Sequence, residues 1–291
     1  MKYKQLIFTT AIGMALTISL QSCRKEAKET LETIVSAEDN STAENEMTSM
    51  FDVADDFSSN DSRVRSGNTI LPNGAIVNFT DSSFTDGDGI ECTIDFGPLK
   101  TSAPKGVLCK DGRYRAGVLH LKMNKRYMLD SAEIQVYANE SDNYYGGSDG
   151  MNMTKISGNI TILKITSGLL KISVTNAKAI NDKGTVTWQS ERVITKTVDN
   201  GPGLLGDEFT VTGAASGVNR NGENFTITID QALEKKIELG CARTFIAGKI
   251  TLTNTSTNKT IKIDYDPYNN KACDLVAKAT INSKEYYYTV R

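Results

Sequence analysis

The chain has 291 residues, of which 23% are charged and 39% hydrophobic, and its formal net charge is -2. This length allows one large domain or two ordinary ones, and the near-neutral charge excludes a strongly basic nucleic-acid binder. A single histidine excludes a metal site built from several imidazoles. It also leaves His120 as the only candidate for histidine acid–base catalysis.

Residues 1–22 have the zones of a secretory signal peptide. Two lysines lie within the first four residues, and the apolar segment Leu6–Leu20 is too short to span a bilayer comfortably. The sequence Leu20-Gln21-Ser22-Cys23 follows, and it resembles the lipobox of bacterial lipoproteins. The resemblance implies cleavage after Ser22 and acylation of Cys23, for example with palmitate. The alternative is an ordinary signal peptide with an incidental cysteine.

Acylation would decide where the protein resides. Two or more acyl chains make a stable anchor, whereas one chain binds a membrane only marginally. We therefore expect a partner membrane, with the protein anchored to the outer membrane at its periplasmic face or at the cell surface. The cluster Arg24-Lys25-Glu26 resembles the charged export signals that direct lipoproteins to the surface in Bacteroidota.

Residues 23–62 are predicted to be an acidic tether, because they are rich in Asp, Glu, Ser and Thr and poor in apolar residues. One segment, 47–57, interrupts this composition. Its apolar residues lie at helical spacing and predict a short helix. These residues are Met47, Met50, Phe51, Ala54 and Phe57. The helix either docks on the main domain or binds a partner.

Residues 63–291 read as a β-rich domain in which apolar and polar residues alternate with period two. We predict an all-β fold, an antiparallel β-sandwich or stacked sheets of long strands, with one short helix before it. Two fused β-units divided near 150–205 are an alternative to one domain. The segment Asp230–Lys236 is predicted to be helical. The predicted strands are Ala75–Thr80, Ile90–Phe96, Gly117–Met123, Ser131–Ala138, Asn159–Ser167, Leu170–Ala179, Thr185–Thr197, Glu208–Gly213, Phe225–Asp230, Thr244–Asn254, Ile261–Tyr265, Leu275–Ile281 and Glu285–Val290.

Four cysteines remain once Cys23 is assigned to acylation, an even number suited to an oxidising compartment. Local pairing favours the disulfides Cys92–Cys109 and Cys241–Cys273. Four buried free thiols are one alternative. A four-thiolate zinc site is another, although the C-x2-C spacing is missing.

A turn rich in glycine and acidic residues suggests a calcium site. Asp86, Asp88 and Glu91 place oxygen ligands around Gly87 and Gly89, as in a calcium loop. The full spacing of an EF-hand is missing, and a plain turn between two strands explains the same residues. No cofactor is assigned from the sequence, and calcium in this loop is the alternative to that assignment.

Aromatic residues and strand carboxylates are the remaining candidates for binding and catalysis. Tyr144, Tyr145 and Trp188 would suit a sugar or protein contact if they were exposed. At least one of Tyr286–Tyr288 is expected in the core. The strand carboxylates, such as Asp95, Glu208 and Asp264, could hydrolyse glycosides only if the fold brought two of them together. No catalytic residue is assigned, and His120 is expected to face solvent or a polar neighbour.

The chain as a whole resembles secreted, β-rich lipoproteins of uncharacterised function in Bacteroidota. The residues that carry this resemblance, beyond the lipobox, are Asp95–Gly97, Asp111–Arg113, Arg115–Gly117, Gly213, Gly217–Gly222 and Cys273-Asp274. The resemblance implies no particular activity.

Three functions follow from the sequence. The first is a non-enzymatic envelope or surface lipoprotein that binds a glycan or an envelope protein or has a structural role. The second is a carboxylate-based polysaccharide hydrolase on a β-sandwich. The third is a fimbria-like assembly subunit, for which an unpaired edge strand is expected.

Overall fold

The computed structural model describes residues 34–55, 57–58, 71, 75–200, 206–238, 245–274 and 276–289. The predicted signal peptide, Cys23 and residues 24–33 lie outside them. A helix covers 34–55 and 57–58, a short 3-10 turn covers Glu140–Asp142, and sixteen strands form one sheet. The strands are β1 (Ile76–Asp81), β2 (Ile90–Asp95), β3 (Val107–Leu108), β4 (Tyr114–Ala116), β5 (Val118–Met123), β6 (Ala132–Ala138), β7 (Tyr145–Gly147), β8 (Thr154–Thr166), β9 (Leu169–Asn181), β10 (Gly184–Val198), β11 (Glu208–Val218), β12 (Asn224–Lys236), β13 (Ala247–Asn254), β14 (Lys259–Asp264), β15 (Val276–Ile281) and β16 (Lys284–Thr289).

The sheet is an antiparallel meander in which most strands lie beside their neighbours in sequence. Its main order is β1-β2-β5-β6-β8-β9-β10-β11-β12-β13-β14-β15-β16. The short strands β3, β4 and β7 form a branch that joins the main sheet where β7 pairs with β8. The predicted all-β, antiparallel fold is confirmed. The sheet runs unbroken through β8, β9, β10 and β11, across the division considered near 150–205.

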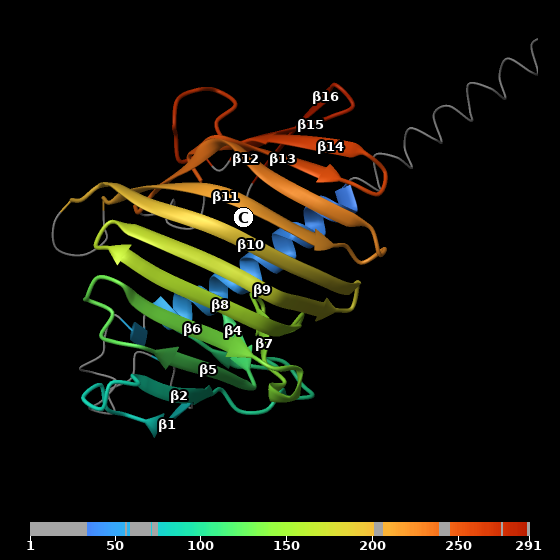
Figure 1. Ribbon diagram of the computed structural model, residues 1–291. Helices are drawn as coiled ribbons and strands as arrows, with labels where there is room; N and C mark the ends of the chain where they lie inside the picture. Colours follow the sequence, from blue (N-terminus) through green and yellow to red (C-terminus); the bar gives the residue numbers. More distant parts are fainter. Residues whose placement is uncertain are drawn as a thin grey trace, which may run out of the picture.

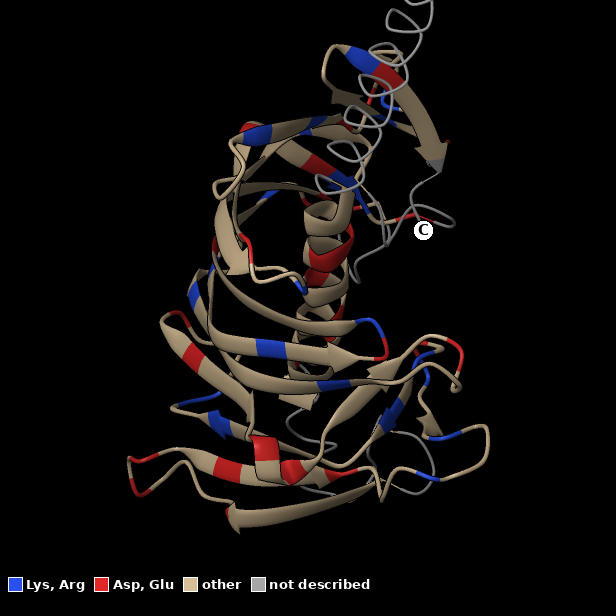
Figure 2. Ribbon diagram, turned by 90° about the vertical axis from the view of Figure 1, so that its right-hand side faces the viewer, with Lys and Arg blue, Asp and Glu red and all other residues tan. Residues whose placement is uncertain are grey.

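The helix fills the concave side of the curved sheet and forms the second layer of the fold (Figures 1 and 2). Its exposed residues form one narrow stripe with spacings of three and four, namely Glu38, Ser41, Asn45, Thr48 and Asp52. The opposite side is buried, and Met50, Ala54 and Phe57 are each 0% exposed. The helix therefore belongs to the central core.

Glycines at bulges allow the long strands to bend around this helix. The ladder between β8 and β9 shifts register between Ser157 and Asn159, and Gly158 lies at the shift with a φ of 137°. The ladder between β11 and β12 shifts between Val211 and Ala214, and Gly213 there has a φ of 130°. Because an extra residue in one strand bends it and increases its twist, these positions help to curve the sheet.

Three expectations are corrected by the structure. The helix predicted at 47–57 exists but begins by residue 34, so 34–58 is a core element where the composition had indicated a solvated tether. The second layer of the predicted sandwich is this helix instead of a separate sheet. Residues Asp230–Lys236 continue β12, because Gln231 and Glu234 pair with β13 and Leu233 is buried, so tertiary pairing overrides local helix propensity.

Candidate functional site

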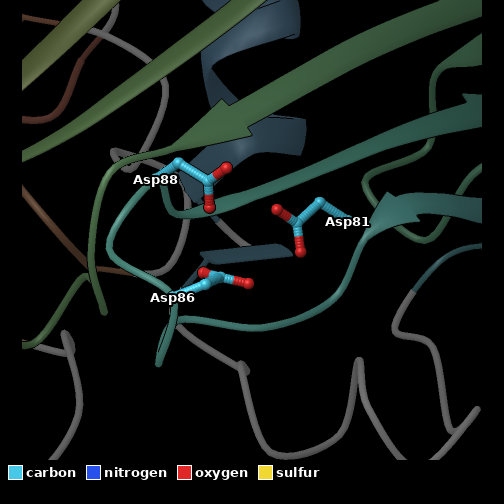
Figure 3. A group of neighbouring side chains, drawn as sticks. All are labelled: Asp81, Asp86 and Asp88. Carbon is cyan, nitrogen blue, oxygen red and sulfur yellow. The ribbon is translucent and has the colours of Figure 1, made fainter.

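The loop between β1 and β2 gathers three carboxylates. Asp81 ends β1, and Asp86 and Asp88 lie in the loop, with one oxygen of each within 4.8 Å of the others. Figure 3 shows the three side chains converging from the two sides of the loop. The backbone amide of Ser83 donates to Asp81 Oδ1 at 2.9 Å, which fixes the first carboxylate.

This cluster differs from the predicted calcium ligands in one member. Asp86 and Asp88 are brought together as predicted, but Glu91 lies in β2, with an oxygen 4.0 Å from Lys122 Nζ. Asp81, at the end of the preceding strand, takes its place. The hydrogen bond with Asp86 and its negative charge raise the pKa of Asp88. Oxygen ligands of this kind suit Ca²⁺, which takes six to eight of them, so calcium stays a prediction for this loop.

A cluster of buried and half-buried charges lies where the helix meets β4 and the turn before it. The Arg115 guanidinium is 1% exposed and donates to both carboxylate oxygens of Asp111, at 2.9 and 2.7 Å. It also donates to the Ser49 hydroxyl on the helix at 2.6 Å. Beside it, Arg113 donates to Glu46 at 2.7 Å. We call Arg115, Asp111, Ser49, Arg113 and Glu46 the arginine clamp, because they tie the helix to the sheet.

Polar contacts of the same kind run along the whole helix. Near its first described turns, Asp39 accepts from the backbone amide and guanidinium of Arg220, at 2.6 and 2.7 Å. Near its last described turns, Asp55 accepts from the Tyr127 hydroxyl at 2.6 Å. Burial raises the pKa values of Asp39 and Asp55, although these partners oppose the shift. These contacts fix the register of the helix on the sheet.

The predicted disulfide between Cys92 and Cys109 is wrong, because both are free, buried thiols. Cys92 lies on the core face of β2, which alternates buried and half-buried residues, and burial raises the pKa of its thiol to about 12. Cys109 lies beside Arg115, and burial raises its pKa as well. Neither is a reactive thiolate. Cys273 is in a disulfide, and Cys241, its expected partner, lies outside the described residues.

Two of the three aromatic residues that were considered for partner binding are buried in the core. Trp188 is 4% exposed, and its indole N–H donates to Asn40 Oδ1 on the helix at 2.8 Å. Tyr144 is 0% exposed and burial raises its pKa to about 12. Tyr145 is half-buried in β7. Their expected role as exposed binding residues is therefore wrong for Trp188 and Tyr144.

Four exposed aromatic side chains lie in the last part of the described chain, in β16 and in the loop between β14 and β15. Tyr286, Tyr287 and Tyr288 of β16 are 44%, 54% and 40% exposed, so the expected core position of at least one of them is wrong. Tyr268 is 58% exposed and stacks on Tyr287, with ring centroids 6.1 Å apart. We call these four residues the tyrosine edge. The run Tyr286–Tyr288 was the sequence signal for the tyrosine edge. The alternation of a strand had predicted that at least one of these three tyrosines would be buried.

An open hollow of about 490 Å³ lies on the face formed by β12 to β15, on the side of the sheet order that ends in β16. Three lysines and two aspartates contribute to its lining, together with threonines. Lys249 pairs with Asp264 at 2.9 Å and Lys278 pairs with Glu285 of β16 at 2.9 Å. These pairs neutralise much of the charge, which suits a neutral polar surface better than a strong anion site.

Two of the candidate hydrolytic residues, Asp95 and Glu208, lie far apart along the sheet. In the sheet, strands β5, β6, β8, β9 and β10 lie between the strand of Asp95 and the strand of Glu208. Neighbouring strands are about 4.8 Å apart, so these carboxylates are too distant to act as a pair. His120 faces a polar neighbour as expected, with Nε2 3.1 Å from Asp142, and stacks on Tyr137.

No family model matches the chain, and no curated protein or solved structure matches it either. Within the described part of the chain, no helix is long and apolar enough to cross a membrane.

Proposed function

We propose that the protein is a lipid-anchored lipoprotein of the cell envelope or surface, with a non-enzymatic binding or structural role. The observation that carries this proposal is Leu20-Gln21-Ser22-Cys23 at the end of a short apolar segment. Only residues 24–33 separate Cys23 from the first described residue of the helix. A chain of that length reaches at most roughly 40 Å, so an acylated Cys23 would hold the domain close to the membrane.

The way the polar residues are used supports a scaffold. Buried and half-buried polar groups hydrogen-bond between the helix and the rest of the domain: Arg115 donates to Ser49, Trp188 to Asn40 and Tyr127 to Asp55. The tyrosine edge groups four of the exposed large apolar side chains of the described residues, and others, such as Met128 and Met151, lie elsewhere on the surface. Exposed tyrosines with a polar end and an apolar body suit contacts with a glycan or a protein. The hydrolase alternative needs two facing carboxylates, and two of its candidates, Asp95 and Glu208, lie in strands that are far apart.

Metabolic labelling with palmitate tests the anchor directly. We expect the full chain to incorporate label and to stay in the membrane fraction after a high-salt wash, and Cys23→Ala to lose both properties. Cys109→Ala is the matched control, because it removes a buried thiol from the domain and leaves the lipobox intact. Equal labelling and membrane retention of the Cys23→Ala variant would contradict the proposal.

A separate experiment tests the role of the domain. The full chain in detergent is applied to a glycan array and is also incubated with envelope polysaccharides, followed by an assay for newly formed reducing ends. We expect no release of reducing sugar. Release that survives Tyr287→Ala but is abolished by Asp264→Asn would favour the hydrolase instead.

A further inference from the structure

The last strand of the sheet, β16, has an open edge and two exposed faces. It lies at one end of the sheet order and, among the described strands, pairs with β15 alone (Figure 1). All of its residues from Lys284 to Tyr288 are exposed, whereas β2, β5, β6 and β13 bury every second residue. An edge of this kind is a template for another strand.

The hairpin geometry identifies which backbone groups point outward. Asn282 and Ser283 form a two-residue turn with φ values of 50° and 63°, so Ile281 and Lys284 are the hydrogen-bonded pair that closes it. Hydrogen-bonded and non-hydrogen-bonded pairs then alternate along the antiparallel ladder. The backbone N–H and C=O groups that face the free edge therefore belong to Glu285, Tyr287 and Thr289.

The opposite edge of the sheet, β1, is a poorer template. Its ladder with β2 shifts register between Phe79 and Asp81, and such bulges protect an edge. Phe79 also packs toward Phe57 of the helix, with ring centroids 6.4 Å apart. In contrast, β16 pairs with β15 over six consecutive positions without a shift and contains no proline.

We propose that β16 pairs antiparallel with β16 of a second copy of this chain, centred on Tyr287. In this register Tyr287 faces Tyr287, and Glu285 faces Thr289, so the outward backbone groups of the two strands meet. Tyr286 of each copy then faces Tyr288 of the other at non-hydrogen-bonded positions, where side chains are closest. Cross-strand aromatic pairs stabilise such a ladder.

The self-complementary sequence of β16 in this register supports a second copy as the occupant. With the centre at Tyr287, no described residue faces a like charge, because Glu285 meets a threonine. The arrangement is two-fold symmetric and closed, since both copies use the same surface. It covers the open edge of β16 and places its tyrosines, which are 40–54% exposed in the single chain, beside tyrosines of the other copy. The dimer does not depend on the acyl anchor.

A single cysteine at the centre tests this register. Paired β16 strands would place the two residues at position 287 about 5.5 Å apart between Cα atoms, within the range of a disulfide. We expect the full-length Tyr287→Cys variant, purified in detergent and oxidised, to form a covalent dimer. The control Asp182→Cys carries its thiol in the exposed turn between β9 and β10 and should stay monomeric on a non-reducing gel.

Mass measurement by light scattering, corrected for detergent, gives the second test. We expect the wild-type chain to have twice the mass of one chain, and Tyr287→Pro to have the mass of a monomer. Proline there removes an outward N–H and no bond to β15, so the far-ultraviolet circular dichroism should not change. A monomeric wild type overturns the proposal. The proposal is also overturned if the wild type is oligomeric but the Tyr287→Cys variant does not crosslink. That result is expected if β16 of one copy paired with β1 of another.

Discussion

The indole N–H of Trp188 donates to Asn40 Oδ1 at 2.8 Å, and this bond joins β10, in the middle of the sheet, to the first described turns of the helix. Both residues are buried, at 4% and 6% exposure. The two positions are far apart in sequence, so the bond forms only when the helix is seated on β10. The single tryptophan of the chain is therefore a reporter of helix docking.

The Asn40→Ala variant should destabilise the protein by about 1–3 kcal/mol, because it leaves a buried indole N–H without a partner. Asn45→Ala is the matched control on the exposed stripe of the same helix and should change stability by less than about 0.5 kcal/mol. Urea unfolding followed by Trp188 fluorescence measures both. Equal effects of the two substitutions would show that the Asn40 bond does not hold the helix.

The sequence predicted the sheet better than the helix, for a physical reason. Alternation in β2, β6 and β10 reports a strand with one buried face, and the local pattern is enough to see it. The helix carries Asp39, Glu46 and other polar residues on its buried side, so its composition resembles a solvated linker. Their partners, such as Arg220 and Arg113, lie far away in sequence and are met only in the folded chain.

The candidate site residues were also predicted correctly where one local segment contains them and wrongly where the folded chain decides their surroundings. The turn signal around Gly87 correctly predicted that Asp86 and Asp88 lie close together, because both belong to one loop. Asp81 was missed since it belongs to the preceding strand. Trp188 and Tyr144 were misplaced because their residue type indicates a binding role or a core role equally well.

Arg115→Ala should be among the most destabilising substitutions in the protein, with a loss of about 3–5 kcal/mol. It removes the buried member of an ion pair and takes away the guanidinium bonds to Asp111 and Ser49. Arg115→Lys should recover only part of this loss, because an ammonium group cannot bind both oxygens of Asp111 and the Ser49 hydroxyl in the same fork.

Lys110→Ala is the control for the arginine clamp, because Lys110 is exposed and lies next to Asp111 in sequence. Its effect should stay within about 0.5 kcal/mol in the same urea titration. Full recovery by Arg115→Lys would mean that charge alone, without the planar geometry, accounts for the clamp.

The hydrogen bond with Asp86 and the neighbouring negative charges raise the pKa of Asp88. Asp88→Asn should raise the melting temperature in EDTA near neutral pH, because it removes one of the carboxylates that repel each other there. Asp182→Asn, in another exposed turn, should leave it unchanged. The calcium prediction adds a second arm to the experiment. If the loop binds Ca²⁺, millimolar calcium raises the melting temperature of the wild type more than that of Asp88→Asn. Equal responses of the two proteins would refute calcium binding by this loop.

The half-buried carboxylate of Asp55 should make stability fall as the pH rises. Burial raises its pKa above the ordinary value of 3.8, against the opposing effects of Tyr127 and Lys164, so the folded state binds a proton more tightly than the unfolded state. The stabilising contribution is fully present below the unfolded pKa and is lost as the pH rises through the folded pKa. Asp55→Asn keeps an acceptor for the Tyr127 hydroxyl and removes the charge. Its advantage over the wild type should therefore grow between about pH 4 and about pH 7.

Asp149 provides a control with the opposite sign. The backbone amides of Asn152 and Met151 donate to it and lower its pKa, so its stabilising contribution is present above the unfolded pKa and is lost as the pH falls. Asp149→Asn should therefore cost more stability near neutral pH than in acid. Urea titrations of the two variants across this range give the comparison. A pH-independent difference between Asp55→Asn and the wild type, together with a normal response of Asp149→Asn, would show that Asp55 is not protonated more readily in the folded protein.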